Sequence, residues 1–236
     1  MPIRKILLFL PGLLTISTVF GQKTEFGLSL NSGLFSFAGR SATGTSAINS
    51  TENLPNYTNN PYGSSVGWCD GLSADLKRVI RRHILLAISL GYEALRSRLS
   101  ITSINLFNGV DAYSLDAHGH TDLTSQFINL YPSFGYRFTP GKLTVDLTGG
   151  LDLGYCLSAA ENGKADAGNG ATYSSSRDRK TISLDIRHRL QVAVGFHKTA
   201  VYIGYSYGLI NYMAGYVGGP TGAYSRLVRF GLQYWP

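Results

Sequence analysis

The chain has 236 residues, a formal charge of +7 and only 15% charged residues, against roughly 25% in an ordinary soluble domain. The basic excess is modest and scattered, which argues against a nucleic-acid-binding protein. Beyond Gly21 no uncharged apolar run approaches the ~20 residues of a spanning helix, which argues against a helical membrane protein.

Residues 1–21 have the pattern of an export signal. Arg4 and Lys5 form a positive start, an apolar stretch follows, and Gly21 supplies a small residue at the expected cleavage point. The apolar stretch is shorter than a spanning helix needs, although a membrane anchor is the competing interpretation. We therefore expect a signal peptide over 1–21 and one domain over 22–236, a length that suits a single all-β domain.

Eight stretches of this domain alternate apolar and polar residues, which is the period of a β-strand with one apolar face. In the clearest stretch, Leu147 belongs to the apolar face and Asp146 to the polar face. Each stretch is long enough for the roughly 9–11 residues of a tilted membrane strand. The predicted strands cover 24–36, 66–79, 83–96, 126–138, 143–155, 181–195, 200–210 and 225–235.

Short and long gaps alternate between these strands. Tight turns on one rim and long loops on the other are typical of a barrel that spans a membrane. The long gaps are rich in Asn, Ser, Thr, Gly and Tyr, and we expect polar loops there. The short gaps lie near 80–82, 139–142 and 197–199, and the long gaps cover 37–65, 97–125, 157–180 and 211–224.

One short gap predicts a hairpin register. Pro140–Gly141 suits the centre of a type II turn, because proline presets the first φ and glycine accepts a positive second φ. This register places Tyr136 opposite Val145 and places Arg137 diagonal to Asp146. Apolar residues then face apolar residues along both strands, and a slip of one residue would break the match.

Alternation alone does not say which face of a barrel points inward. The polar face consists mostly of Gly, Ser, Thr, Asp and Arg, with few of the Lys and Glu that cover soluble proteins. Together with the loop rhythm, this favours a membrane barrel, in which the apolar face points outward. We predict an eight-stranded antiparallel up-and-down transmembrane β-barrel. Aromatic residues near strand ends are expected to form interfacial girdles: Phe26, Tyr92, Tyr136, Phe138, Tyr155, Tyr234 and Trp235.

The chain resembles the eight-stranded outer-membrane β-barrel families, namely the membrane domain of outer-membrane protein A and the PorT-like barrels. The resemblance rests on strand count, loop rhythm, the signal ending at Gly21 and the alternating last strand Val228–Trp235. In such families the barrel-assembly machinery reads a final strand that ends in an aromatic residue, whereas this chain adds Pro236 after Trp235. The resemblance implies a location in the bacterial outer membrane, contact with outer-membrane lipid, and no cofactor.

The inward face of the predicted barrel gathers charged residues. Eight strands leave an interior that side chains fill, and opposite charges there should pair because a lone buried charge is costly. The favoured interpretation is a salt-bridged plug, and the alternative is a narrow or gated ion path. The predicted lumen charge network comprises Glu93, Asp146, Asp152, Asp185, Arg187, Arg189, Arg229 and Arg137, with Asp75 and Lys77 on the same face.

Three other features are candidates for chemistry. His188 falls on the lipid-facing side of its strand, where a polar residue suggests function, but its neighbours on that face are apolar. His118 and His120 form a weak metal signal in a polar gap, so we expect no metal site. Cys69 and Cys156 both face inward, and the sequence leaves open whether they are bonded.

These patterns predict a non-enzymatic barrel with a structural or surface-contact role through its long loops, where we expect an extracellular ligand to bind. Two alternatives stay open. The first is transport, as a small porin or a secretion-accessory barrel. The second is a lipid-modifying outer-membrane enzyme centred on His188.

Overall fold

The structure is a computed structural model that describes residues 23–52, 54–215 and 221–236, so the expected signal peptide lies outside the described residues. Within the described part, no helix is long and apolar enough to cross a membrane. The described chain is built from strands: β1 (Lys23–Ala38), β2 (Thr45–Thr51), β3 (Tyr57–Thr58), β4 (Ser65–Ile80), β5 (Ile84–Phe107), β6 (Ala112–Phe138), β7 (Leu143–Ala167), β8 (Thr172–Asp178), β9 (Leu184–Phe196), β10 (Thr199–Gly208) and β11 (Tyr224–Tyr234).

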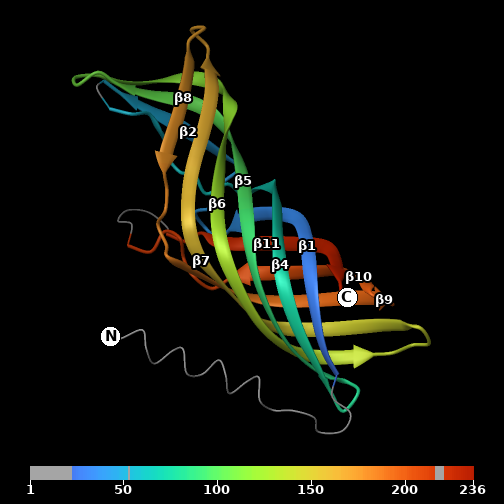
Figure 1. Cartoon of the computed structure of the whole chain (residues 1–236). Helices are drawn as coiled ribbons and strands as arrows, with labels where there is room; N and C mark the ends of the chain where they lie inside the picture. Colours follow the sequence, from blue (N-terminus) through green and yellow to red (C-terminus); the bar gives the residue numbers. More distant parts are fainter. Residues whose placement is uncertain (1–22, 53, 216–220) are drawn as a thin grey trace.

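Eight of these strands close into a ring in the order β1, β4, β5, β6, β7, β9, β10 and β11, and β11 pairs back with β1. All eight pairings are antiparallel (Figure 1). Following paired residues once around the ring from Leu34 returns to Thr24, ten residues away on β1. With a rise of ~3.3 Å per residue and ~4.7 Å between strands, this stagger tilts the strands by about 40° from the barrel axis.

The barrel has its apolar face outside and its charges inside, as predicted. Leu147 and Ile203 are 49% and 58% exposed, whereas Asp146 and Arg187 are buried. Glycine and small polar residues fill much of the inner face, where large side chains from eight strands would collide. This inversion of the usual soluble pattern is what a lipid-facing surface requires.

A second sheet region stands beyond one rim of the barrel and is called the outer extension here. It consists of β2, β3, β8 and residues 97–107, 112–125 and 158–167 of β5, β6 and β7 (Figure 1). β2 pairs parallel with β5, and β8 pairs antiparallel with β7. The prediction of long polar loops over these segments was therefore wrong, since most of their residues lie in strands.

Polarity changes sides where the barrel passes into the outer extension. Along β5 the outward face changes from exposed Leu90 to Arg98, while the inward face changes from buried Glu93 to buried Leu99. The extension therefore has an apolar core of its own and a polar outer surface. Its core comprises Ile48, Leu99, Ile101, Ile104, Ala117, Ala165 and Ala167. The change of sides marks the level at which the strands leave the hydrocarbon layer of the membrane.

A β-bulge explains why the sequence pattern ended early on β7. Phe127 pairs with Cys156 and Gln126 pairs with Ser158, which leaves Leu157 as an extra residue. The extra residue reverses the parity of the strand beyond it, so Ala159 rather than Ser158 points inward. A search for strict alternation stops at such a bulge.

The hairpin between β6 and β7 corrects the predicted register. Phe138 pairs with Val145 and Arg137 pairs directly with Asp146, so the strands are shifted by two residues from the prediction. The turn is centred on Gly141–Lys142, not on Pro140–Gly141, and Gly141 has a φ of 63°. A glycine with positive φ at the first central position is typical of a type II′ turn, whose twist matches a hairpin better than type II. The two-residue shift preserves which residues face inward.

Candidate functional site

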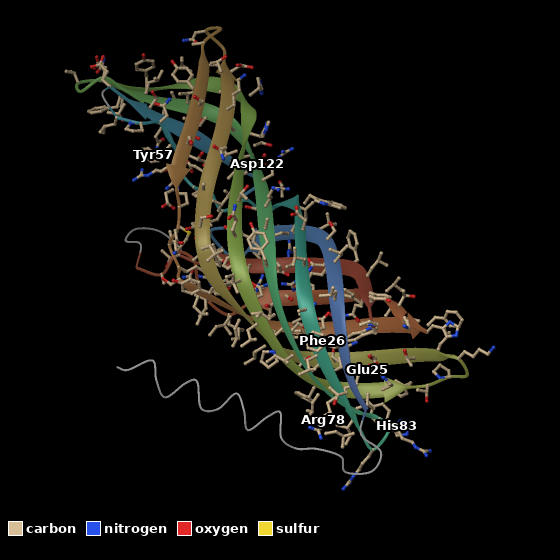
Figure 2. The ribbon with its side chains drawn as sticks, in the orientation of Figure 1. Glu25, Phe26, Tyr57, Arg78, His83 and Asp122 are labelled. Carbon is tan, nitrogen blue, oxygen red and sulfur yellow. The ribbon has the colours of Figure 1, made fainter. Side chains whose placement is uncertain are left out.

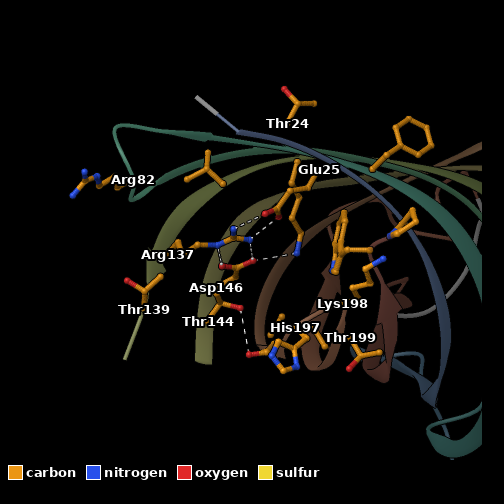
Figure 3. A pocket seen from close by; sticks show the side chains of 18 residues that line it. Thr24, Glu25, Arg82, Arg137, Thr139, Thr144, Asp146, His197, Lys198 and Thr199 are labelled. Atoms are coloured by element: carbon orange, nitrogen blue, oxygen red, sulfur yellow. Dashed lines mark hydrogen bonds and ion pairs between the residues drawn. The ribbon is translucent and has the colours of Figure 1, made fainter. Parts of the chain in front are cut away.

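An ion cluster, called the lower cluster, crosses the lumen near the rim that carries the short turns. Arg137 donates to Glu25 at 3.0 Å and to Asp146 at 2.7 and 2.9 Å (Figure 3). Lys77 adds a fourth member, with its Nζ 3.1 Å from Asp146 Oδ2. Two carboxylates and two cations from four strands therefore neutralise one another. Fork-shaped pairing of a guanidinium with two carboxylates is a strong and directional arrangement.

A cavity of about 630 Å³ lies between this lower cluster and the short-turn rim. Trp235 lines the cavity, and its ring centroid is 4.3 Å from Lys77 Nζ. Gly27 leaves room for the ring, since a Cβ there would stand 2.5 Å from it. The prediction that Trp235 belongs to an outer aromatic girdle was wrong: β11 ends at Tyr234, and the next side chain points into the mouth of the barrel.

A second ion cluster, called the upper cluster, fills the lumen near the opposite rim and is buried. Arg229 contacts Glu93 at 2.5 Å and Asp152 at 2.6 Å. Arg187 lies 3.3 Å from Asp152 and 3.5 Å from Glu93, and its Nε is 3.7 Å from Asp185. These opposite charges pair with one another in the lumen, although Arg187 Nε and Nη1 make no hydrogen bond within the described residues. Removing one partner would leave its neighbours unpaired.

Arg189 lies between the two clusters and departs from the predicted network. Its guanidinium is 4.3 Å from the ring centroid of Tyr131 and donates to Gln191 at 2.5 Å. Within the described residues it forms no ion pair. A cavity of about 20 Å³ beside Arg189, Tyr131 and Glu93 has room for roughly one water molecule.

Aromatic rings cover the upper cluster at the base of the outer extension. The ring of Phe37 makes edge contacts with Phe35, Tyr62 and Tyr212 at centroid distances of 4.9 to 5.1 Å. Tyr212 Oη donates to Asp185 at 2.8 Å, which joins this aromatic cap to the ions below. Burial, followed by the charge of Asp185, raises the pKa of the Tyr212 phenol well above its usual value.

The structure brings seven of the eight predicted network residues into ion clusters: Glu93, Asp152, Asp185, Arg187 and Arg229 above, and Arg137 and Asp146 below. Two further charged residues were predicted on the inward face. Lys77 joins the lower cluster, whereas Asp75 accepts a hydrogen bond from Ser29.

Sequence reasoning missed Glu25 and Tyr212. Glu25 stood next to outward Phe26 and could have been found by parity. Tyr212 lay in a Gly- and Tyr-rich stretch without strand alternation, so the sequence offered no signal that it caps the lumen.

The remaining candidates do not form chemical centres in the described structure. His188 is exposed on the outer face of β9, where its ring stacks on Tyr207 at a centroid distance of 5.8 Å. His118 and His120 lie exposed on the outer face of β6, and no metal-holding group of three His, Cys, Asp or Glu occurs among the described residues. Cys69 and Cys156 are free, buried thiols.

A buried polar seam closes the outer extension where the edge strands β3 and β8 approach each other. Glu161 accepts from the Thr58 amide at 2.9 Å and from Arg179 Nε at 2.8 Å. Thr58 Oγ1 also lies 3.0 Å from Thr121 Oγ1. The sequence placed Glu161 and Arg179 in a long loop and gave no indication of this pairing. The seam gives the extension a fixed shape.

A closed ring of antiparallel strands, an apolar outer belt and a charged, filled lumen together define an eight-stranded transmembrane β-barrel. The extension lies at the opposite end of the molecule from the short turns; Figure 2 shows Tyr57 and Asp122 far from Phe26 and His83.

No protein-family model and no curated protein sequence matches the chain. Among solved structures, Neisserial surface protein A is similar at 15% identity over 91% of this chain and 98% of that chain, with a TM-score of 0.38. The Ail attachment invasion locus protein of Yersinia pestis, in complex with the heparin analogue sucrose octasulfate, is similar at 10% identity, 91% and 99% coverage, and a TM-score of 0.34. The translocator domain of the autotransporter NalP from Neisseria meningitidis is similar at 14% identity, 98% and 93% coverage, and a TM-score of 0.23. The eight-stranded closure follows from the strand pairing of this chain, not from these likenesses.

Proposed function

We propose that the protein is a non-enzymatic barrel of the bacterial outer membrane that does not conduct solutes and that makes surface contacts through its outer extension. The short-turn rim then faces the periplasm and the extension faces the outside. Outer-membrane lipid surrounds the belt, and the barrel-assembly machinery acts during biogenesis.

The observation that carries the proposal is the filling of the lumen. From the short-turn rim outward, the lower cluster, the layer with Arg189, the upper cluster and the aromatic cap follow one another. Opening a path would separate buried charges from their partners, at a cost of several kcal/mol for each ion left unpaired. By contrast, the extension has its own core and a closed seam, and it presents a shaped polar surface.

Conductance in planar bilayers tests the first half of the proposal. The purified barrel should produce no current steps above the lipid background. Regular unitary steps from the folded protein would contradict it and favour the porin alternative. A matched preparation with Tyr212→Ala and Phe37→Ala, which removes two rings of the aromatic cap, shows whether the ion clusters seal the lumen without that cap.

Labelling of intact cells tests location and orientation. Val110 is 86% exposed at the tip of the β5–β6 hairpin, and Lys142 lies in a short turn. A membrane-impermeant maleimide should label Val110→Cys on intact cells and should label Lys142→Cys only after the outer membrane is permeabilised. Wild type is the matched control, because Cys69 and Cys156 are buried. The reverse labelling pattern would overturn the orientation.

A further inference from the structure

A row of hydrogen-bonded polar side chains crosses the outer face of the extension. Asn49 on β2 pairs directly with Asn105 on β5, which pairs with Ser114 on β6. Asn105 Nδ2 donates to Asn49 Oδ1 at 2.9 Å, and Ser114 Oγ donates to Asn105 Oδ1 at 3.1 Å. These bonds fix the amide planes and still leave donors and acceptors of both amides directed to solvent.

Two aromatic residues flank this row and make it the floor of a groove. Tyr57 on β3 is paired opposite Asn49, and Phe107, which is 44% exposed, lies two residues beyond Asn105 on the same face of β5. The groove has a volume of about 500 Å³, which is within the range of about 300–1,000 Å³ for small-molecule sites. Within the described residues, no charged side chain lines it.

The buried seam holds one of these aromatic rings in place. The guanidinium groups of Arg177 and Arg179 lie 5.3 and 5.7 Å from the centroid of Tyr57. Arg179 is in turn held by Glu161, which also binds the amide of the next residue, Thr58. The ring is therefore positioned before any ligand arrives, which reduces the entropy lost on binding.

We propose that this groove binds an uncharged oligosaccharide, an inference that rests on the proposed surface-contact function and names its ligand class. A sugar ring offers an apolar C–H face that can pack on Tyr57 or Phe107. Its hydroxyl groups both donate and accept hydrogen bonds, which matches the side-chain amides of Asn49 and Asn105. Among the described residues, the groove lining includes no cation for an acidic glycan to pair with; the nearest cations, Arg177 and Arg179, lie against the Tyr57 ring, and Arg179 is paired with Glu161.

Binding measurements on the full-length folded barrel in detergent micelles test the proposal. Saturation-transfer NMR and calorimetry would use maltotriose, cellotriose, tri-N-acetylchitotriose and N-acetyllactosamine as neutral probes, and 3′-sialyllactose and a heparin tetrasaccharide as acidic probes. At least one neutral probe should bind, and Asn105→Ala and Tyr57→Ala should each weaken that binding at least tenfold. Tyr57→Phe should retain most of the binding, because the ring remains.

Asn162→Ala is the matched control, since this asparagine lies exposed on the outer face of β7 and bonds to Ser176, away from the groove. It should bind like wild type. The proposal is overturned if no neutral probe binds with a Kd below about 10 mM, if only the acidic probes bind, or if Asn105→Ala and Asn162→Ala lose binding equally. Each of these results leaves the conductance and labelling tests of the proposed function unaffected.

Discussion

Charged residues in the lumen are held by opposite charges that have no access to bulk water. The same type of residue therefore contributes more to stability in the lumen than on the surface. Arg229 and Arg226 lie three positions apart on β11. Arg229 is buried against two carboxylates, whereas Arg226 is exposed and donates to the hydroxyl of Ser36 at 3.0 and 3.2 Å. The parity of the strand, which sequence alone reveals, thus separates a structural arginine from a surface arginine.

We expect Arg229→Ala to lower the free energy of unfolding by about 3–5 kcal/mol, because Glu93 and Asp152 would remain buried without a cation. Arg226→Ala should change it by less than about 0.5 kcal/mol. Urea unfolding in lipid vesicles, followed by tryptophan fluorescence, measures both. Adding Glu93→Gln to Arg229→Ala should recover part of the loss; equal losses in the two single variants would refute this account.

At the level of elements, alternation predicted all eight barrel strands and which face of each points inward. It failed where strands leave the membrane, because the two faces exchange polarity there and Leu157 breaks the phase. The lower cluster was within reach of the sequence through Arg137 and Asp146. The aromatic cap and the Glu161 seam were not, since they depend on loops and edge strands that meet only in three dimensions.

Deleting Leu157 together with Ser158 should disorganise the outer extension while leaving the barrel intact. Removal of both residues turns those beyond the bulge to the opposite side, so Glu161 would point to solvent and its seam with Arg179 would open. Limited proteolysis should then cut between residues 159 and 180, whereas the heat-dependent gel mobility of the folded barrel should persist. Deleting Leu157 alone is the control, because it removes the bulge and leaves Glu161 facing inward; protection of the double deletion equal to wild type would contradict this role for the strand register.

At the scale of the whole molecule, the strand tilt and the length of the apolar belt determine the hydrocarbon thickness of the membrane that the barrel matches. On β7 the outward apolar residues run from Leu143 to Tyr155. At ~3.3 Å per residue and a tilt of about 40°, the part from Leu143 to Leu153 spans about 25 Å along the barrel axis, and Tyr155 lies beyond it at the interface. The hydrocarbon layer it matches is therefore thin, as in a bacterial outer membrane.

The folded yield should accordingly be higher in vesicles of lipids with 12- or 14-carbon chains than in those with 18-carbon chains. The shift in gel mobility between folded and heat-denatured protein measures that yield. Equal or better folding in the thicker vesicles would show that the belt is not the determinant. Leu147→Arg, which places a charge in the belt, should reduce the yield in every vesicle, at a cost of about 2–4 kcal/mol.

The parallel pairing of β2 with β5 has a consequence for the order of events during synthesis and export. The segment that contains β2 and β3 emerges early, yet its partners are β5 and, through Arg179 and Glu161, the far hairpin of β7 and β8. An early stretch of chain can therefore complete its contacts only when residues more than a hundred positions later lie on the same side of the barrel. Until then the edges of β2 and β3 lack their partners and are open to pairing with other strands.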